Sequence, residues 1–339
     1  MGSRPEYRPG FCASSIRFIS CLVRINHLGQ PRCIWLNSLD LRGIVPATVL
    51  PMKEDFSVDE DSLTNYMKWI SKFEIGGLAI NVDTGEGPHL FPEERVQVLK
   101  IVSGIVNVPI VAGLTSRFTA EAVQMALDAK KAGADGLLMF PLPAFGGQPL
   151  DPNLPYQYHK TVAEKTDMPM VLFQLQPALG GIEFTPECLM KLIEIEQVVA
   201  LKEASFDARK YSDTLRTLRQ ASRKINMLTG NDNFILESFI LGAEGALIGF
   251  GTLATDLQAE MFELVQKKRF DEAREISNRL QPLVDAIFAP PVRDYRARTK
   301  EALLMQGVIK HAYVRPPLLP VSESEQSRIR NALKKAGQL

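Results

Sequence analysis

The chain has 339 residues, of which 45% are hydrophobic and 23% are charged, and its 39 lysines and arginines balance 39 aspartates and glutamates. This neutral balance argues against nucleic acid or an anionic membrane as the main partner, because either would call for a basic surface. No run of about 18 apolar residues is present, so the sequence predicts no membrane span. Its four cysteines show no metal-ligand spacing, and three lie in the first 33 residues, which favours a reducing compartment.

Residues 1–39 differ in composition from the rest of the chain. Residues 1–38 contain five arginines, one glutamate and no lysine, and proline and glycine interrupt them. An arginine-rich, acid-poor segment is typical of a transit peptide, which leaves an organellar location open beside a cytoplasmic one. The simpler interpretation, which we adopt, is an N-terminal extension outside the fold.

From residue 41 onward, short apolar runs alternate with longer amphipathic segments. The runs predict strands at Gly43–Leu50, Gly77–Asp83, Val108–Gly113, Gly136–Phe140, Met170–Leu175, Val198–Lys202, Ile225–Thr229 and Ala246–Phe250. The intervening segments carry apolar residues at spacings of three and four, which predicts helices at Asp59–Phe73, Pro92–Val106, Thr119–Ala132, Leu154–Thr166, Thr185–Ile195, Asp207–Arg223, Asn233–Leu241 and Leu257–Lys268. Thr119 and Thr185 are start signals, and Gly133 and Gly242 are stop signals.

Strands this apolar are typical of a parallel sheet that is covered on both faces. Eight strand–helix units within about 210 residues favour an α/β fold of the (β/α)8 TIM-barrel type, with an open doubly wound sheet as the alternative. We predict the barrel over residues 40–268 and a helical region over residues 269–339. The helices of that region are expected at Asp271–Ile287, Val292–Met305 and Ser322–Lys335.

In such a barrel the chemistry lies at the carboxyl ends of the strands. Lys202 ends the sixth apolar run, where a low dielectric would lower its pKa and make a neutral amine available for Schiff-base formation. The alternative is a lysine that extends to the rim or pairs with Glu203. After the second run, Asn81–Gly87 could hold a carboxylate or phosphate, or form an ordinary turn capped by Asp83 or Thr84.

Several motifs in chain order resemble the dihydrodipicolinate synthase / N-acetylneuraminate lyase family of class I aldolases. Gly43–Pro51 resembles the opening strand, and Val82–Glu86 stands in place of the G-[ST]-T-G-E loop. Ala200–Ala204 matches the G-x-K-[ED]-[AS] strand, with Ala200 in place of the glycine. Thr229–Asp232 is similar to the S-G-x-D turn, and Val314–Val321 is similar to the C-terminal tail.

The resemblance implies a (β/α)8 barrel with a C-terminal helical domain, and Lys202 as the Schiff-base lysine. It also implies 2-keto acid substrates, often with pyruvate as donor, and usually a homotetramer built as a dimer of dimers. We expect a homotetramer or a homodimer. No metal or organic cofactor is expected.

The chain departs from the family at its proton relay. Phe173 stands where the family has a tyrosine at the end of strand five, and Asp83 replaces the first of two loop hydroxyls, so that only Thr84 remains. Phe140–Ala144 lacks the tyrosine that synthases extend into the neighbouring subunit's site, and the arginine just beyond strand five is missing. All seven tyrosines lie away from predicted strand ends.

We therefore predict a lyase of the aldolase or dehydratase type, other than dihydrodipicolinate synthase, that acts on a 2-keto acid or related carbonyl compound through Lys202. Asp83, desolvated in the barrel mouth, would replace the lost phenol as acid or base, unless it only caps the turn. The apolar loop Phe140–Phe145 favours an aromatic or aliphatic substrate portion. The alternatives are a pseudoenzyme with a ligand-binding or regulatory role, and an enzyme whose Lys202 does other chemistry.

The catalytic residues predicted are Lys202 and Asp83, and the substrate contacts predicted are Thr84, Gly85, Phe173, Gln174, Gly230 and Leu247. The partner expected is a small molecule, with no nucleic acid and no membrane. His89 is expected at the rim of the site. A solvated helix face is expected for Arg293, Arg296, Arg298 and Lys300.

Overall fold

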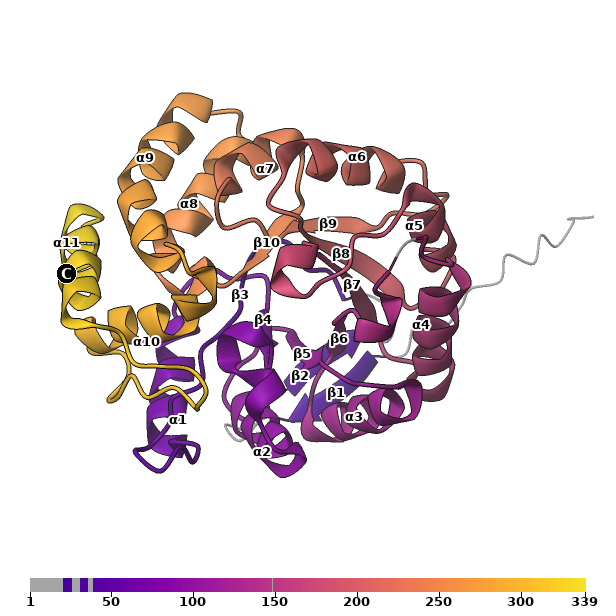
Figure 1. Cartoon of the computed structure of the whole chain (residues 1–339), viewed down its shortest axis with the longest axis horizontal. Coiled ribbons are helices and arrows are strands. Elements are labelled where there is room, and N and C mark those ends of the chain that lie inside the picture. The colour runs from indigo at the N-terminus through magenta and orange to yellow at the C-terminus, as the bar shows by residue number, and fades with distance from the viewer. Residues whose placement is uncertain (1–20, 26–30, 36–38, 148) are drawn as a thin grey trace, which may run out of the picture.

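The computed structural model describes residues 21–25, 31–35, 39–147 and 149–339. Eight parallel strands form a ring with helices outside it (Figure 1), which confirms the predicted (β/α)8 barrel. The strands are β3 (Gly43–Pro46), β4 (Leu78–Ile80), β5 (Ile110–Leu114), β6 (Gly136–Met139), β7 (Met170–Leu175), β8 (Val198–Ala204), β9 (Asn226–Thr229) and β10 (Gly245–Ile248). They pair in the order β3-β10-β9-β8-β7-β6-β5-β4, and a parallel bridge between Ala47 and Ala79 closes the ring.

Each barrel strand is followed by a helix that buries its apolar face against the ring. The helices are α1 (Glu60–Ile70), α2 (Pro92–Ser103), α3 (Thr119–Ala132), α4 (Asn153–Thr166), α5 (Pro186–Leu192), α6 (Ala208–Leu218), α7 (Ile235–Leu241) and α8 (Thr255–Gln266). Thr185 caps α5 by accepting a bond from the amide of Cys188 at 3.2 Å, whereas Thr119 is the first residue of α3 and caps nothing. Gly133 and Gly242 end their helices at φ 103° and 106°, where a side chain would be strained.

Alternation along the strands decides which side chains can reach the barrel mouth. In β7 and β8 the register pairs Phe173 with Lys202, and both point to the inside of the ring. Their neighbours Gln174 and Glu203 therefore point outward, toward the helices. Below the mouth, the inside is filled by buried apolar side chains that include Val45, Val111, Leu138, Val171, Ala200, Leu228 and Leu247.

The C-terminal helices α9 (Phe270–Ile287), α10 (Tyr295–Met305) and α11 (Glu323–Lys335) gather along one side of the barrel, beside α8 and α1 (Figure 1). The predicted solvated face is wrong for three of its four residues, because Arg296, Arg298 and Lys300 of α10 are 9%, 1% and 0% exposed. The fourth residue, Arg293, lies in the 3-10 turn before α10. The other three are covered because α10 lies between the loop after β4 and α11. Arg298 donates to Glu325 of α11 at 2.9 Å.

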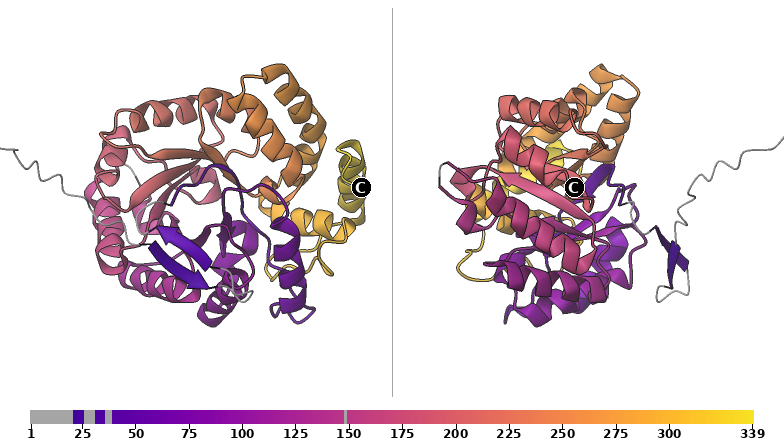
Figure 2. Two further views of the ribbon diagram at one scale, coloured as in Figure 1. Left: turned by 180° about the vertical axis from the view of Figure 1, so that it is seen from behind. Right: turned by 90° about the vertical axis from the view of Figure 1, so that its right-hand side faces the viewer.

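Before the barrel, β1 (Cys21–Ile25) and β2 (Pro31–Trp35) form an antiparallel pair, which stands apart from the barrel in the right-hand view of Figure 2. The rest of the predicted N-terminal extension, residues 1–20, 26–30 and 36–38, lies outside the described residues. Asp40 contacts the barrel, because its carboxylate accepts a hydrogen bond from the Asn226 side-chain amide at 3.0 Å. Within the described ranges, no helix is both long and apolar enough to cross a membrane.

Candidate active site

A cavity of about 740 Å³ opens at the carboxyl ends of the barrel strands. Residues at or just after the ends of β4 to β10 line it, together with the start of α10. This is the place where barrel enzymes hold their chemistry. The C-terminal helical region therefore contributes side chains to the same cavity as the barrel strands.

Lys202 reaches the cavity from β8, and its Nζ lies 4.3 Å from the centre of the Phe173 ring. Among the described residues, no hydrogen bond or ion pair holds this nitrogen. Burial lowers the pKa of Lys202 to about 8, against smaller opposing effects of the Asp232 and Asp83 charges. At pH 7 roughly a tenth of the side chain is then the neutral amine, far more than for a lysine in water.

The alternative pairing of Lys202 with Glu203 is absent, because Glu203 faces the helices. There its carboxylate accepts bonds from the Ser205 amide at 3.0 Å and from the Asn231 side chain at 2.7 Å. Space for Lys202 comes from Gly230, where an added Cβ would lie 2.7 Å from the lysine Cε. The end of β9 thus requires a glycine if Lys202 is to keep its position.

Asp83 and Thr84 follow β4 and are both bonded to α10. The Asp83 carboxylate accepts bonds from Arg296 at 2.8 Å and from the Tyr295 hydroxyl at 2.9 Å. The Tyr295 oxygen also lies 3.1 Å from Thr84 Oγ1. The Asp83 side chain is 45% exposed and ion-paired, so its environment differs from the desolvated, unpaired carboxyl group expected from the sequence.

Tyr295 is a site residue that the sequence reasoning missed. Its ring stacks on Phe288, with centroids 5.2 Å apart and planes 17° from parallel, and burial raises the pKa of its phenol. Gly249, at the end of β10, leaves room for the ring, since an added Cβ would lie 2.9 Å from Tyr295 Cε2. Alternation along a strand predicts side chains at strand ends, whereas this phenol comes from a helix beyond the barrel.

A buried ion pair holds α10 against the loop after β4. Glu86 Oε1 accepts a bond from Lys300 at 2.5 Å, and both side chains are fully buried. Glu86 Oε2 accepts a second bond, at 2.8 Å, from the amide of Arg315. Because Glu86 lies three residues after Asp83, these bonds fix Asp83 and Thr84 relative to Tyr295.

Three of the predicted substrate contacts, Thr84, Phe173 and Gly230, line the cavity, and three do not. The Gln174 amide is used outside the ring, where it donates to Thr214 at 3.0 Å and accepts from the Phe184 amide at 3.0 Å. Leu247 is fully buried in the barrel interior. Gly85 lies in the 3-10 turn after β4, where its amide bonds to Val82 at 3.1 Å. His89 also lies outside the cavity lining.

Asp232 is a second residue that the sequence reasoning left out of the site, although it belongs to the Thr229–Asp232 motif. It lines the cavity, is 7% exposed and accepts a bond from the Phe250 amide at 2.9 Å. Burial raises the pKa of Asp232 to about 6. Its charge is therefore retained at neutral pH and lost within the mildly acidic range.

Charge is unevenly distributed around the cavity. Five basic residues line it (Arg95, Arg117, Lys202, Arg293 and Arg296), against three acidic ones (Asp83, Glu121 and Asp232). An excess of cations favours an anionic ligand. Another part of the lining is apolar and consists of Phe140, Pro141 and Phe173. The arginine missing after β7 does not leave this cavity without guanidinium groups.

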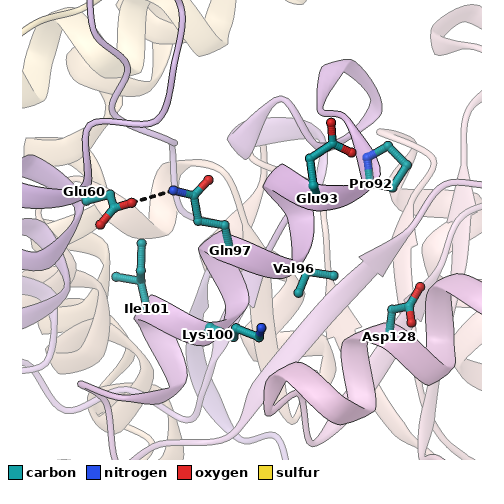
Figure 3. Close-up of a pocket in the computed structure, with 8 residues that line it drawn as sticks. All are labelled: Glu60, Pro92, Glu93, Val96, Gln97, Lys100, Ile101 and Asp128. Atoms are coloured by element: carbon teal, nitrogen blue, oxygen red, sulfur yellow. Dashed lines mark hydrogen bonds between the residues drawn. The ribbon is translucent and has the colours of Figure 1, made fainter.

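A second hollow, of about 670 Å³, lies on the outer faces of α1, α2 and α3 (Figure 3). Gln97 crosses it to bond Glu60 at 2.5 Å, and Glu93, Lys100 and Asp128 stand around it. It lies on helix surfaces, away from the strand ends and from Lys202. We therefore place the candidate active site in the cavity at the barrel mouth.

Comparison with known proteins identifies the family of this chain. The model of the dihydrodipicolinate synthetase family matches residues 40–336. A 4-hydroxy-tetrahydrodipicolinate synthase from Methanothrix thermoacetophila is 33% identical over 298 residues, which is 88% of this chain and 98% of that protein. Among solved structures, a monomeric dihydrodipicolinate synthase variant superposes with a TM-score of 0.81 at 26% identity, over 89% of this chain and 99% of that one.

The dihydrodipicolinate synthase from Acinetobacter baumannii complexed with pyruvate superposes with a TM-score of 0.78 at 28% identity, over 88% of this chain and all of that one. These matches span the barrel and the C-terminal helices. The chain therefore belongs to the dihydrodipicolinate synthetase family, and it is an enzyme of the class I aldolase-like lyase type.

Proposed function

We propose that this enzyme forms a Schiff base between Lys202 and a 2-keto acid or related carbonyl compound, and that it catalyses an aldolase or dehydratase reaction other than that of dihydrodipicolinate synthase. The observation that carries the proposal is the position of Lys202. Its nitrogen is unpaired among the described residues, faces a large cavity and has a pKa lowered to about 8. Those are the properties that an imine-forming amine needs.

The charge of the cavity supports a 2-keto acid as the ligand. Its five basic residues favour a carboxylate, and the Asp83 charge that would repel one is offset by Arg296 at 2.8 Å. The apolar part of the lining, with Phe140 and Phe173, suits an uncharged substrate portion. Pyruvate, present in the complex of the Acinetobacter baumannii relative, is the first donor to test.

A reaction other than that of the synthases is supported by what surrounds Lys202. Phe173 stacks beside the lysine and offers no proton, and Asp83 stands where the family loop has a hydroxyl. These changes lie within the cavity, where they alter the ligand that fits. They leave the lysine in place, which is the combination expected when the substrate changes and the imine chemistry does not.

Borohydride trapping tests the proposal. The protein is incubated with pyruvate, 2-ketobutyrate, oxaloacetate or 2-ketoglutarate, reduced, and analysed by intact mass and peptide mapping. We expect a single adduct on Lys202 that is absent from Lys202→Ala. Lys210→Ala, which removes a surface lysine paired with Glu183 at 2.6 Å, is the matched control and should keep the adduct. A folded wild-type protein that gives no adduct with any of these acids would overturn the proposal.

We further propose that the protein assembles as a homotetramer or homodimer, as the family resemblance implies. One of its structural relatives is monomeric, so the assembly is a separate question from the fold. Light scattering coupled to gel filtration measures the mass directly. A particle of one chain, 37.7 kDa, would contradict this part of the proposal.

A further inference from the structure

An imine-forming site must also move protons, and the Lys202 strand pair supplies no group for this. Phe173, the residue that faces Lys202 across the strand pair, is an apolar ring. The cavity does contain a phenol, that of Tyr295, which enters from α10. The question is whether Tyr295 is bonded in a way that could carry a proton.

The hydrogen bonds of Tyr295 form a directed chain. Its hydroxyl donates to Asp83 Oδ2 at 2.9 Å, so the 3.1 Å contact with Thr84 must be a bond in which Thr84 Oγ1 donates to the phenol oxygen. Arg296 stabilises the far end by donating to Asp83 Oδ1 at 2.8 Å. The chain thus runs from a hydroxyl in the cavity to an ion-paired carboxylate.

The fold is shaped to hold this arrangement. Gly249 leaves the space that the Tyr295 ring fills, and the Phe288 ring stacks on it. The buried Glu86–Lys300 pair locks the loop of Asp83 and Thr84 onto α10. A phenol held by a required glycine, a stacked ring and a buried ion pair is positioned more tightly than a surface tyrosine.

We propose that Thr84, Tyr295 and Asp83 form a proton relay within one chain, which replaces a phenol at the position of Phe173. The inference rests on the proposed function. Thr84 exchanges protons with the substrate, Tyr295 is the positioning and relay residue behind it, and Asp83 is the terminal acceptor. Because all three residues belong to the same chain, the relay requires no residue from a second subunit.

The proton balance is closed. The Lys202 amine adds to the keto carbon and passes one of its protons to the oxygen. The resulting hydroxyl group leaves as water with one proton from solvent, so the nitrogen keeps its second proton and a protonated imine forms. Loss of a proton from the adjacent carbon then gives the enamine. That proton passes to Thr84 Oγ1 while the Thr84 proton passes to Tyr295 and the Tyr295 proton passes to Asp83, which becomes a neutral carboxyl group. Protonation of the enamine carbon follows the same path in reverse.

Deuterium exchange separates this relay from imine formation. In D2O, the enzyme should exchange the methyl protons of pyruvate, which proton NMR follows, while borohydride reports the imine. Tyr295→Phe keeps the ring and its stacking, so we expect the final adduct yield of wild type. Exchange should fall by about 100-fold or more, the usual loss when an acid–base group is removed. Tyr313→Phe, a tyrosine outside the cavity lining, is the matched control.

Thr84 provides the second readout, which a merely structural role of Tyr295 would not move. Thr84→Ser keeps a hydroxyl and should retain exchange within several-fold, whereas Thr84→Val should lose it as Tyr295→Phe does. Since both belong to one chain of bonds, the double variant Thr84→Val/Tyr295→Phe should be no slower than either single one. The relay would be overturned if the losses of exchange rate in the two single variants multiplied in the double variant. It would also be overturned if Tyr295→Phe exchanged within threefold of the wild-type rate. A wild-type protein without adduct would instead overturn the proposed function.

Discussion

The hydroxyl of Tyr295 donates a hydrogen bond to Asp83 over 2.9 Å, although 212 positions separate the two residues in the chain. Asp83 follows the second barrel strand, and Tyr295 begins a helix beyond the barrel. The bond therefore joins the cavity loop of the barrel to the C-terminal helical region. It makes that region part of the candidate site, and several measurable consequences follow from the contacts around it.

Imine formation should depend on pH through Lys202. Since the pKa of Lys202 is lowered to about 8, the rate of adduct formation should rise about tenfold per pH unit below 8 and level off above it. Single-turnover trapping with pyruvate between pH 6 and 10 measures this profile. A rate that continues to rise toward the ordinary lysine value of 10.5 would show that burial does not lower this pKa.

Asp83→Asn should affect imine formation and proton exchange differently. The Asp83 charge raises the pKa of Lys202, so its removal should move the acid limb of the trapping profile to lower pH. Exchange of the pyruvate protons should fall about 100-fold, because an amide is a poor final acceptor. Asp271→Asn, whose side chain is 87% exposed on α9, is the control and should change neither profile. A matching decrease in both rates would contradict the separate roles.

Two glycines at the cavity provide a matched pair of steric tests. Gly230→Ala places a methyl group 2.7 Å from Lys202 Cε, and Gly249→Ala places one 2.9 Å from Tyr295 Cε2. The first should reduce adduct formation, whereas the second should preserve the final adduct yield and reduce exchange. Each displaces a packed group, so a stability loss of about 1–3 kcal/mol is expected in both. Equal effects on adduct and exchange in both variants would refute the assignment.

Lys300→Met should destabilise the protein strongly, because Glu86 would remain fully buried without its partner. Breaking such a pair costs about 3–5 kcal/mol, and adding Glu86→Gln should restore part of the loss by removing the unpaired charge. Urea unfolding measures both. Lys267→Met breaks the exposed pair with Glu263 and should change the free energy of unfolding by less than about 1 kcal/mol. If Lys300→Met and Lys267→Met lost similar free energies of unfolding, the buried Glu86–Lys300 pair would not be what holds the loop after β4 against α10.

The barrel could be predicted from the sequence because its elements are marked locally. Met170–Leu175 and Thr119–Ala132 have the predicted bounds, since their apolar patterns begin and end sharply. The first strand is shorter than predicted: β3 ends at Pro46, whereas the apolar pattern runs to Leu50. The apolar pattern continues because the residues after Pro46 remain buried, although beyond the isolated bridge of Ala47 they no longer belong to a strand.

The position of Lys202 could also be predicted from the sequence, because the end of a barrel strand is a defined place. The same alternation could have placed Gln174 outside the ring, since it is adjacent to the inward Phe173. The positions of Tyr295 and Arg296 in the site could not be predicted in this way. Their contacts depend on how the C-terminal helices fold back on the barrel, and no local pattern relates residue 295 to residue 83. The burial of Lys300 could not be predicted for the same reason, because its partner Glu86 lies 214 positions earlier in the chain.

The Glu86 carboxylate accepts two hydrogen bonds, from Lys300 and from the amide of Arg315, and both donors come late in the chain. The loop of Glu86 therefore gains these partners late during synthesis. All eight barrel strands have been made by residue 248, but both partners that hold the loop of Asp83 and Thr84 are translated later. A nascent chain still attached to the ribosome would thus contain Lys202 and every strand of the ring without an assembled relay. The proposed relay would be assembled only after the segment around Arg315 has left the exit tunnel.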